Sequence, residues 1–159
     1  PPALPLHLSL LDLEPQWKSY THTLAQLFAP RGASVDFDVC DVAARGGACT
    51  DAVVATLGRA DCLIFAFVLH ETSLAAEAAD WAFYRSLGRR CKPGAVLIFA
   101  DVIGRAAQCF AQVESAMAQG LAAKGGDGRA LKALRRIPLA DGLGLALHAE
   151  LMVLHVASV

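Results

Sequence analysis

The sequence predicts an α/β fold, in which a mostly parallel β-sheet carries helices on both faces. Apolar segments rich in β-forming residues alternate with segments of helical spacing along the 159 residues. Such alternation with short connections is typical of parallel strands joined by crossover helices. The composition, 55% hydrophobic and 18% charged, suits a sheet buried between helices. The length suits one domain that spans residues 1–159.

One stretch, residues 61–71, organises this prediction. Residues 63–69 are all apolar and do not alternate with polar ones, which predicts a central strand that is covered on both faces. His70 and Glu71 follow this strand directly. Since ligands of open α/β sheets bind beyond the carboxyl ends of the strands, we expect the functional site beside these two residues.

Two strands and two helices are predicted before this stretch. The strands cover residues 6–13 and 33–39, where apolar residues recur at the spacing of a β-strand. Between them, a helix over 16–29 follows Pro15, which suits the first turn of a helix. A shorter helix is predicted over 51–57.

Two helices and one strand are predicted in the next part of the chain. The first helix covers 74–87, with Thr72 or Ser73 as its N-terminal cap. A buried strand over 95–102 comes next, and a helix over 106–123 follows it.

The last part of the chain contains a basic segment and a closing strand. Residues 129–136 are expected to form a short basic helix. Residues 151–156 are expected to form the final strand. An antiparallel pair is expected at this end, with its first arm between residues 137 and 147.

Several aromatic and sulfur-containing side chains are expected in the core. Trp17, Trp81 and Tyr84 occur at helical spacing. The five cysteines are odd in number and form no C-x-x-C pair, which argues against a zinc site. Cys40 and Cys62 fall in or at predicted strands, so we expect buried, reduced thiols in an intracellular protein, cytoplasmic or organellar.

Charge and hydropathy exclude some classes of partner. The net charge of -1 argues against broad, nonspecific binding of nucleic acid, although a local basic patch remains compatible with it. No apolar run reaches the roughly 18–20 residues that a membrane span needs, so we expect no membrane partner.

Acidic residues end the first two predicted strands. Asp12 ends the first, where a carboxylate in a nucleotide-binding α/β fold commonly accepts hydrogen bonds from two ribose hydroxyls. Asp41 and Val42 follow the second, where an acceptor beside an apolar side chain suits an adenine ring. The alternative for Asp12 is a helix cap before Pro15, and for Asp41 it is a turn cap.

Four short motifs follow or precede successive strands in a fixed order. They are Asp12-Leu13-Glu14-Pro15, Cys40-Asp41-Val42, Phe67-Val68-Leu69-His70-Glu71 and Lys92-Pro93-Gly94-Ala95. In this order the chain resembles the class I S-adenosylmethionine-dependent methyltransferases over nearly its whole length. The resemblance implies a Rossmann-like sheet that ends in an antiparallel strand beside the strand over 95–102.

The resemblance also implies a cofactor and roles for individual residues. S-adenosylmethionine would bind with its ribose on Asp12 and Leu13, its adenine near Asp41 and Val42, and its sulfonium near Phe67. In some O-methyltransferase relatives, a histidine at the place of His70 is the base, and Glu71 is a second catalytic candidate. The alternative for His70 is a polar residue that begins the next helix.

The chain departs from the family at its beginning. The family's first strand and glycine-rich loop are expected before residue 6, where only residues 1–5 stand. The domain is therefore expected to be N-terminally incomplete, or else to have lost its need for the cofactor. That second case predicts an inactive structural or binding subunit of a larger, RNA-containing assembly. A nicotinamide-binding enzyme is a third candidate, but its glycine fingerprint is absent.

The methyl acceptor is not encoded in any motif that we can name. It is a small molecule, RNA or a protein. A basic segment over 124–136 suits an RNA or protein partner in an assembly. Its cationic residues are Lys124, Arg129, Lys132, Arg135 and Arg136.

Overall fold

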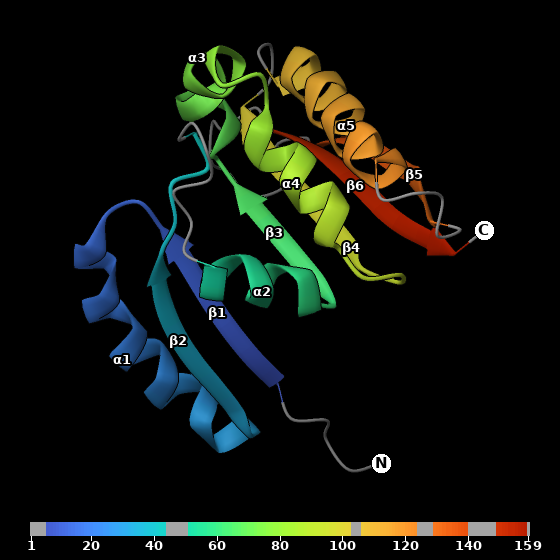
Figure 1. Ribbon diagram of the computed structural model, residues 1–159. Helices are drawn as coiled ribbons and strands as arrows, with labels where there is room; N and C mark the ends of the chain where they lie inside the picture. Colours follow the sequence, from blue (N-terminus) through green and yellow to red (C-terminus); the bar gives the residue numbers. More distant parts are fainter. Residues whose placement is uncertain (1–5, 44–50, 103–105, 124–128, 140–148, 159) are drawn as a thin grey trace. The chain divides into compact units, whose positions relative to one another are not determined.

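The computed structural model describes residues 6–43, 51–102, 106–123, 129–139 and 149–158 (Figure 1). The chain divides into two compact units, Pro1–Asp41 and Val42–Val159. Each unit has its own β-sheet, and each is described by itself below. No helix in the described ranges combines the length and the apolar character that crossing a membrane demands.

The first unit is a β-α-β arrangement. Strand β1 (Leu6–Asp12) leads through a 3₁₀ turn (Pro15–Trp17) into helix α1 (Lys18–Phe28), and strand β2 (Ala33–Val39) follows. The two strands pair in parallel from Leu6 opposite Ala33 to Asp12 opposite Val39. These elements confirm the strands and the helix predicted from the sequence. The parallel pairing also places the carboxyl ends of both strands at one end of this sheet.

The surface of this small sheet carries a polar cluster. His7 Nδ1 lies 2.6 Å from Ser34 Oγ, and His7 Nε2 lies 3.1 Å from Asp36 Oδ2. The side chains of His7 and Asp36 are more than half exposed. Such exposed cross-strand pairs contribute little to stability, so Asp36 is a suitable control position for this unit.

The second unit begins with helix α2 (Asp51–Arg59), strand β3 (Cys62–Ala66), helix α3 (Leu69–Ala78) and helix α4 (Ala82–Arg90). It continues through strand β4 (Val96–Val102), helix α5 (Ala106–Ala122) and strands β5 (Arg129–Leu139) and β6 (Ala149–Ser158). The strand order is β3-β4-β6-β5. Strands β3 and β4 are parallel, whereas β6 is antiparallel to both of its neighbours. The predicted antiparallel strand at the C-terminal end is therefore confirmed.

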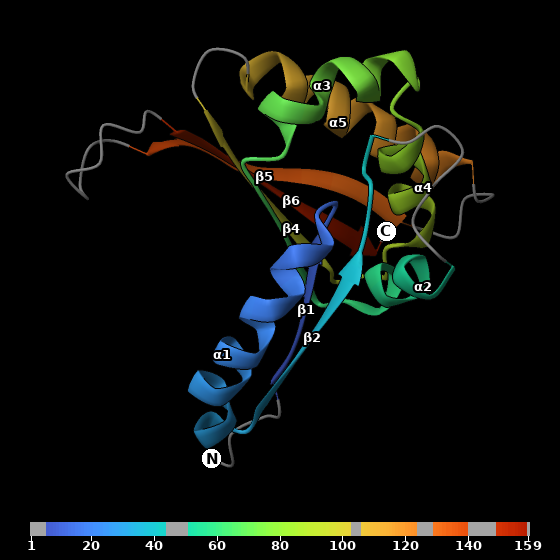
Figure 2. The same cartoon turned by 90° about the vertical axis from the view of Figure 1, so that its left-hand side faces the viewer.

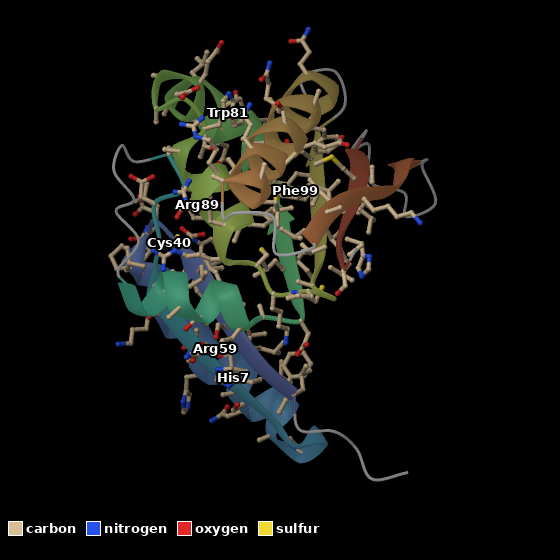
Figure 3. The ribbon with its side chains drawn as sticks, turned by 45° about the vertical axis from the view of Figure 1, so that its right-hand side comes forward. His7, Cys40, Arg59, Trp81, Arg89 and Phe99 are labelled. Carbon is tan, nitrogen blue, oxygen red and sulfur yellow. The ribbon has the colours of Figure 1, made fainter. Side chains whose placement is uncertain are left out.

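The core of this unit lies between one face of the four-stranded sheet and helices α4 and α5 (Figures 1 and 2). Phe65 of β3 stacks on Phe99 of β4, with ring centroids 4.6 Å apart. Phe99, labelled in Figure 3, is fully buried. The fully buried side chains around it come from both helices and from β6: Tyr84, Phe110, Val113, Met117, Met152 and Leu154.

Two glycines allow α4 and α5 to approach closely. A Cβ at Gly88 would collide with the backbone oxygen of Met117, and a Cβ at Gly120 would collide with that of Arg85. Backbone atoms cannot move aside as the end of a flexible side chain can, so any larger residue must separate the helices. This packing holds the helical layer against the sheet.

The predicted helix over 74–87 is wrong, because the structure has two helices there. Helix α3 begins at Leu69 rather than at a Thr72 or Ser73 cap, and the chain breaks between α3 and α4. Asp80 and Trp81 adopt left-handed backbone angles, with φ of 52° and 54°. Burial of Trp81 at the junction of the two helices (Figure 3) and an ion pair of 2.8 Å from Asp80 to Arg85 hold this break. Left-handed non-glycine residues cost on the order of 1–3 kcal/mol each.

The organising strand is shorter than predicted and has an exposed side. Strand β3 ends at Ala66, and Phe67 turns the chain with a φ of 57°. Ile64 is 68% exposed, which contradicts the prediction that both faces are covered. Exposed and buried residues alternate along β3, from the exposed Cys62 to the exposed Ala66, so only the face of Leu63 and Phe65 is covered.

The basic segment over 129–136 is a strand, not the predicted helix. Strand β5 pairs with β6 from Arg129 opposite Ser158 to Leu139 opposite Ala149, with an irregularity between Ala133 and Arg135. This long-range pairing overrides the local helical preference of the segment. A contact of segment 124–136 with RNA or protein stays a prediction, because only part of the segment is described.

Three of the expected core residues differ from the prediction. Trp17 is 49% exposed and contacts Tyr20 at the surface, with ring centroids 5.0 Å apart. Cys40 is buried as expected, but it takes part in a disulfide bond and is not a reduced thiol. Cys62 is an exposed free thiol, because it lies on the uncovered face of β3. Trp81 and Tyr84 are buried as predicted.

We expect Gly120→Ala to lower the free energy of unfolding by about 1–3 kcal/mol, because the new methyl group separates α4 from α5. Urea denaturation of the variant and the wild type measures this difference. Ala118→Ser, at an exposed position of the same helix, is the control and should change the value by less than about 0.5 kcal/mol. A Gly120→Ala variant as stable as the wild type would contradict the close packing.

Candidate functional site

The carboxyl ends of β3 and β4 bring a histidine and a buried aspartate together. The two strands pair in parallel up to Ala66 opposite Ala100, and the amide of Phe67 then donates to the carbonyl oxygen of Ala100 at 2.7 Å. Asp101 follows Ala100 in β4, while the chain after Phe67 turns into α3. His70 in the first turn of α3 therefore lies beside Asp101.

Asp101 is the most constrained polar side chain of this region. It is 1% exposed and accepts four hydrogen bonds. Oδ2 accepts from the backbone amides of Leu69 at 2.7 Å and His70 at 3.2 Å. Oδ1 accepts from the Val102 amide at 2.8 Å and from Nδ1 of His70 at 2.9 Å. The carboxylate thus caps α3 from a neighbouring strand and also holds the imidazole.

The contact with Asp101 fixes the tautomer of His70. A carboxylate only accepts hydrogen bonds, so Nδ1 of His70 carries the proton that it donates. In the neutral imidazole, Nε2 is then left with a lone pair. Nε2 lies 3.7 Å from Oε1 of Glu71, and the His70 side chain is 33% exposed. The site therefore presents a proton-accepting nitrogen at a partly accessible position.

Phe67 places an aromatic ring beside the imidazole of His70. Its φ of 57° lies in the left-handed region, where a glycine would be less strained. The ring is 38% exposed. Its centroid lies 6.4 Å from that of His70, and the two rings are nearly perpendicular, at 82°.

Two buried hydroxyl groups lie in the same unit. Ser73 Oγ and Tyr84 OH find no hydrogen-bond partner among the described residues. Burial, and to a lesser extent the charges of Asp101 and Cys109, raise the pKa of Tyr84 above its usual range. Tyr84 is therefore a neutral phenol in the core and not an acid or a base of the site.

The predicted residues of the first unit also share one end of their sheet. Asp12 ends β1, and its Oδ1 accepts a hydrogen bond of 2.9 Å from the Glu14 amide. The amide of Cys40 donates to the Asp12 carbonyl oxygen at 3.0 Å, and Asp41 follows it. Leu13 is 55% exposed. The structure thus groups Asp12, Leu13 and Asp41 in one unit and Val42, Phe67, His70 and Glu71 in the other.

Asp101 is the residue of the site that the sequence motifs do not identify. In the sequence, Asp101 is the single charged residue of an otherwise apolar strand, which is the next strand after His70 in the chain. A buried carboxylate is rare unless it is paired, so that signal could have marked it. Nothing in the described part of the chain gathers three or more metal-ligating side chains.

Comparison with known proteins places this fold. No family model and no curated protein matches the chain. Among solved structures, the N-methyltransferase NodS from Bradyrhizobium japonicum aligns with a TM-score of 0.54 and 14% identity. That alignment covers 96% of this chain and 74% of NodS. The fold is that of the class I methyltransferases.

Two further structures give the same result. Phosphoethanolamine N-methyltransferase 2 from Haemonchus contortus, in complex with S-adenosyl-L-methionine, aligns at 13% identity with a TM-score of 0.52. The O-methyltransferase NcsB1 from neocarzinostatin biosynthesis, in complex with S-adenosyl-L-homocysteine and 1,4-dihydroxy-2-naphthoic acid, aligns at 12% identity with a TM-score of 0.52. Each alignment covers 99% of this chain, but only 34% and 50% of these two proteins. The Rossmann-like fold class predicted from the sequence is confirmed.

We expect Tyr84→Phe to reduce the loss of stability at alkaline pH. Because folding raises the pKa of Tyr84, its neutral form stabilises the folded state below the pKa of an unfolded tyrosine, about 10. That contribution is lost as the pH rises further, by up to about 1.4 kcal/mol per pH unit. Denaturation of both proteins between pH 8 and 11 measures the difference.

The matched control for this measurement is Tyr20→Phe, because the Tyr20 side chain is 56% exposed. Near pH 7, Tyr84→Phe should be about as stable as the wild type, since it removes a buried hydroxyl that has no partner within the described residues. Equal alkaline slopes for the wild type and Tyr84→Phe would show that the phenol is accessible to solvent.

Proposed function

We propose that this chain is a methyltransferase domain that uses S-adenosylmethionine, with His70 as the general base. The observation that carries the proposal is the hydrogen bond of 2.9 Å between His70 Nδ1 and the buried Asp101. The fold supports it, because NodS, NcsB1 and the Haemonchus enzyme are methyltransferases by name. Two of these three structures contain S-adenosylmethionine or S-adenosylhomocysteine.

Each residue predicted to contact the cofactor suits one part of it by its own chemistry. Oδ1 of Asp12 accepts the Glu14 amide, while Oδ2 accepts no hydrogen bond from the described residues, so it is open to a ribose hydroxyl. Asp41 and Val42 would hold the adenine, and Phe67 would lie near the sulfonium. When bound, the cofactor supplies an electrophilic methyl group on a positively charged sulfur.

His70 removes the proton that the methyl acceptor must lose. Its Nε2 takes this proton before or as the acceptor atom forms its bond to the methyl carbon. The cofactor would supply that carbon by cleavage of its carbon–sulfur bond, whose electron pair would stay on sulfur. Asp101 stabilises the resulting imidazolium, because its carboxylate stays hydrogen-bonded to Nδ1. General-base catalysis of this kind contributes roughly 10²–10⁴-fold to a rate.

Cofactor binding tests the first part of the proposal. We expect S-adenosylhomocysteine to bind saturably in calorimetry, and Asp12→Ala to weaken the dissociation constant about 10- to 100-fold, as expected when about 1.5–3 kcal/mol of charge-assisted hydrogen bonding is lost. Asp36→Ala, an exposed aspartate of the same unit, is the control and should bind like the wild type. No binding to the native protein would overturn the proposal.

Methyl transfer tests the second part. We expect Asp101→Asn to lower kcat by about 10²-fold or more, because an amide can hold the imidazole in the wrong tautomer. The affinity for S-adenosylhomocysteine should stay within about threefold, since the hydrogen bonds of Asp101 go to Leu69, His70 and Val102 and to no residue predicted to contact the cofactor. Glu77→Gln, at an exposed position of α3, controls for the loss of one negative charge. An Asp101→Asn variant with unchanged kcat and an intact fold by circular dichroism would exclude His70 as an Asp101-assisted base.

A further inference from the structure

We propose that the methyl acceptor is a cationic amine, whose ammonium group binds between Glu71 and Phe67 beside Nε2 of His70. The inference rests on the proposed function, because it assigns the acceptor of the same site. The charged groups and the aromatic ring near His70 indicate this class of acceptor.

The first observation is the sign of the charges around His70. Glu71 Oε1 lies 3.7 Å from Nε2, and Asp101 Oδ1 lies 2.9 Å from Nδ1. Both partners of the imidazole are carboxylates. Among the described residues, Glu71 forms no ion pair with a lysine or an arginine, and its side chain is 73% exposed. This open carboxylate attracts a cation to the accessible side of the base.

The second observation concerns the charge of the acceptor during the reaction. A hydroxyl group that loses its proton becomes an anion, and it would do so next to the Glu71 carboxylate. An ammonium group that loses its proton becomes a neutral amine with the lone pair that methylation needs. In both cases His70 becomes a cation between Glu71 and Asp101. The carboxylates therefore favour an amine acceptor over a hydroxyl.

The third observation is the position of Phe67. Its ring is 38% exposed and lies next to His70, at a backbone angle where a side chain is strained. Strained residues persist where the surrounding structure holds them, and they gather at ligand sites. A partly exposed aromatic ring attracts an ammonium group to its face by cation–π attraction.

Two ligands of the same shape test the charge preference. 2-Phenylethylamine is a cation at pH 7, whereas 2-phenylethanol has the same skeleton and is neutral. With S-adenosylhomocysteine saturating the protein, we expect the amine to bind about tenfold more tightly, as expected from one exposed charge pair and one cation–π contact. NMR titration of the protein with each ligand, followed at the resonances of residues 67–71, measures both affinities. 4-Ethylphenol is the corresponding phenol and should bind no better than the alcohol.

Variants assign the preference to the two residues. Glu71→Gln should reduce the amine preference by about two- to fivefold, which is the range of an exposed charge pair. Glu77→Gln, an exposed glutamate of the same helix, should leave it unchanged. Phe67→Leu should weaken the amine by about threefold and leave the alcohol nearly unaffected.

The outcomes separate this inference from the proposed function. Equal binding of amine and alcohol, or tighter binding of 4-ethylphenol, overturns the amine assignment when S-adenosylhomocysteine still binds. An amine preference that Glu71→Gln leaves intact overturns the role of Glu71. Loss of S-adenosylhomocysteine binding from the native protein overturns the proposed function itself, whichever acceptor is preferred.

Discussion

The second unit depends on one buried carboxylate. Asp101 is fully hydrogen-bonded, and its four donors come from α3, from the following residue and from the His70 ring. A charge at this depth is tolerated only when it is paired in this way. The same bonds that satisfy the charge also start α3 and orient His70. The architecture and the candidate chemistry therefore share one set of contacts.

The rest of the second unit supports Asp101 through aromatic side chains of the core and through closely packed helices. Phe99, two residues before Asp101, is fully buried against Phe65 and Tyr84. In the helical layer, glycines at the crossing of α4 and α5 let the two helices touch through their backbones. By contrast, α3 buries only Leu69, Ser73 and Ala76, and left-handed residues stand at both of its ends. Besides these few buried side chains, the helix that carries His70 is held by its N-terminal hydrogen bonds to Asp101.

Much of the fold could be predicted from hydrophobic spacing. The strand over 33–39 and the helix that begins at 106 agree with the structure because their apolar residues recur at a clear period. The break at 79–81 could not be predicted in this way, since Asp80 and Trp81 adopt left-handed angles without a glycine or proline to indicate them. The strand at 129–139 depends on its pairing with β6. The sequence of this segment taken alone favours a helix instead.

In the candidate site, too, some residues could be predicted from the sequence and others could not. His70 and Glu71 could be proposed because they follow an apolar segment that forms a strand, and polar residues at that place commonly bind ligands. Asp101 could not be assigned a role in this way, because its partners are 31 and 32 residues away in the sequence. Its contacts form only because the parallel strands β3 and β4 end side by side in the fold. Asp12 and Asp41 share the end of a sheet for the same reason.

The most direct test of this account is the tautomer of His70 in solution. Long-range ¹H–¹⁵N NMR of protein labelled at histidine, with the His70 signals assigned by comparison with His70→Gln, distinguishes protonation at Nδ1 from protonation at Nε2. Above the range where the ring is charged, we expect the proton on Nδ1, which most neutral histidines in water do not favour. A proton on Nε2, or a rapid exchange between both forms, would contradict the hydrogen bond to Asp101 on which the proposed base depends.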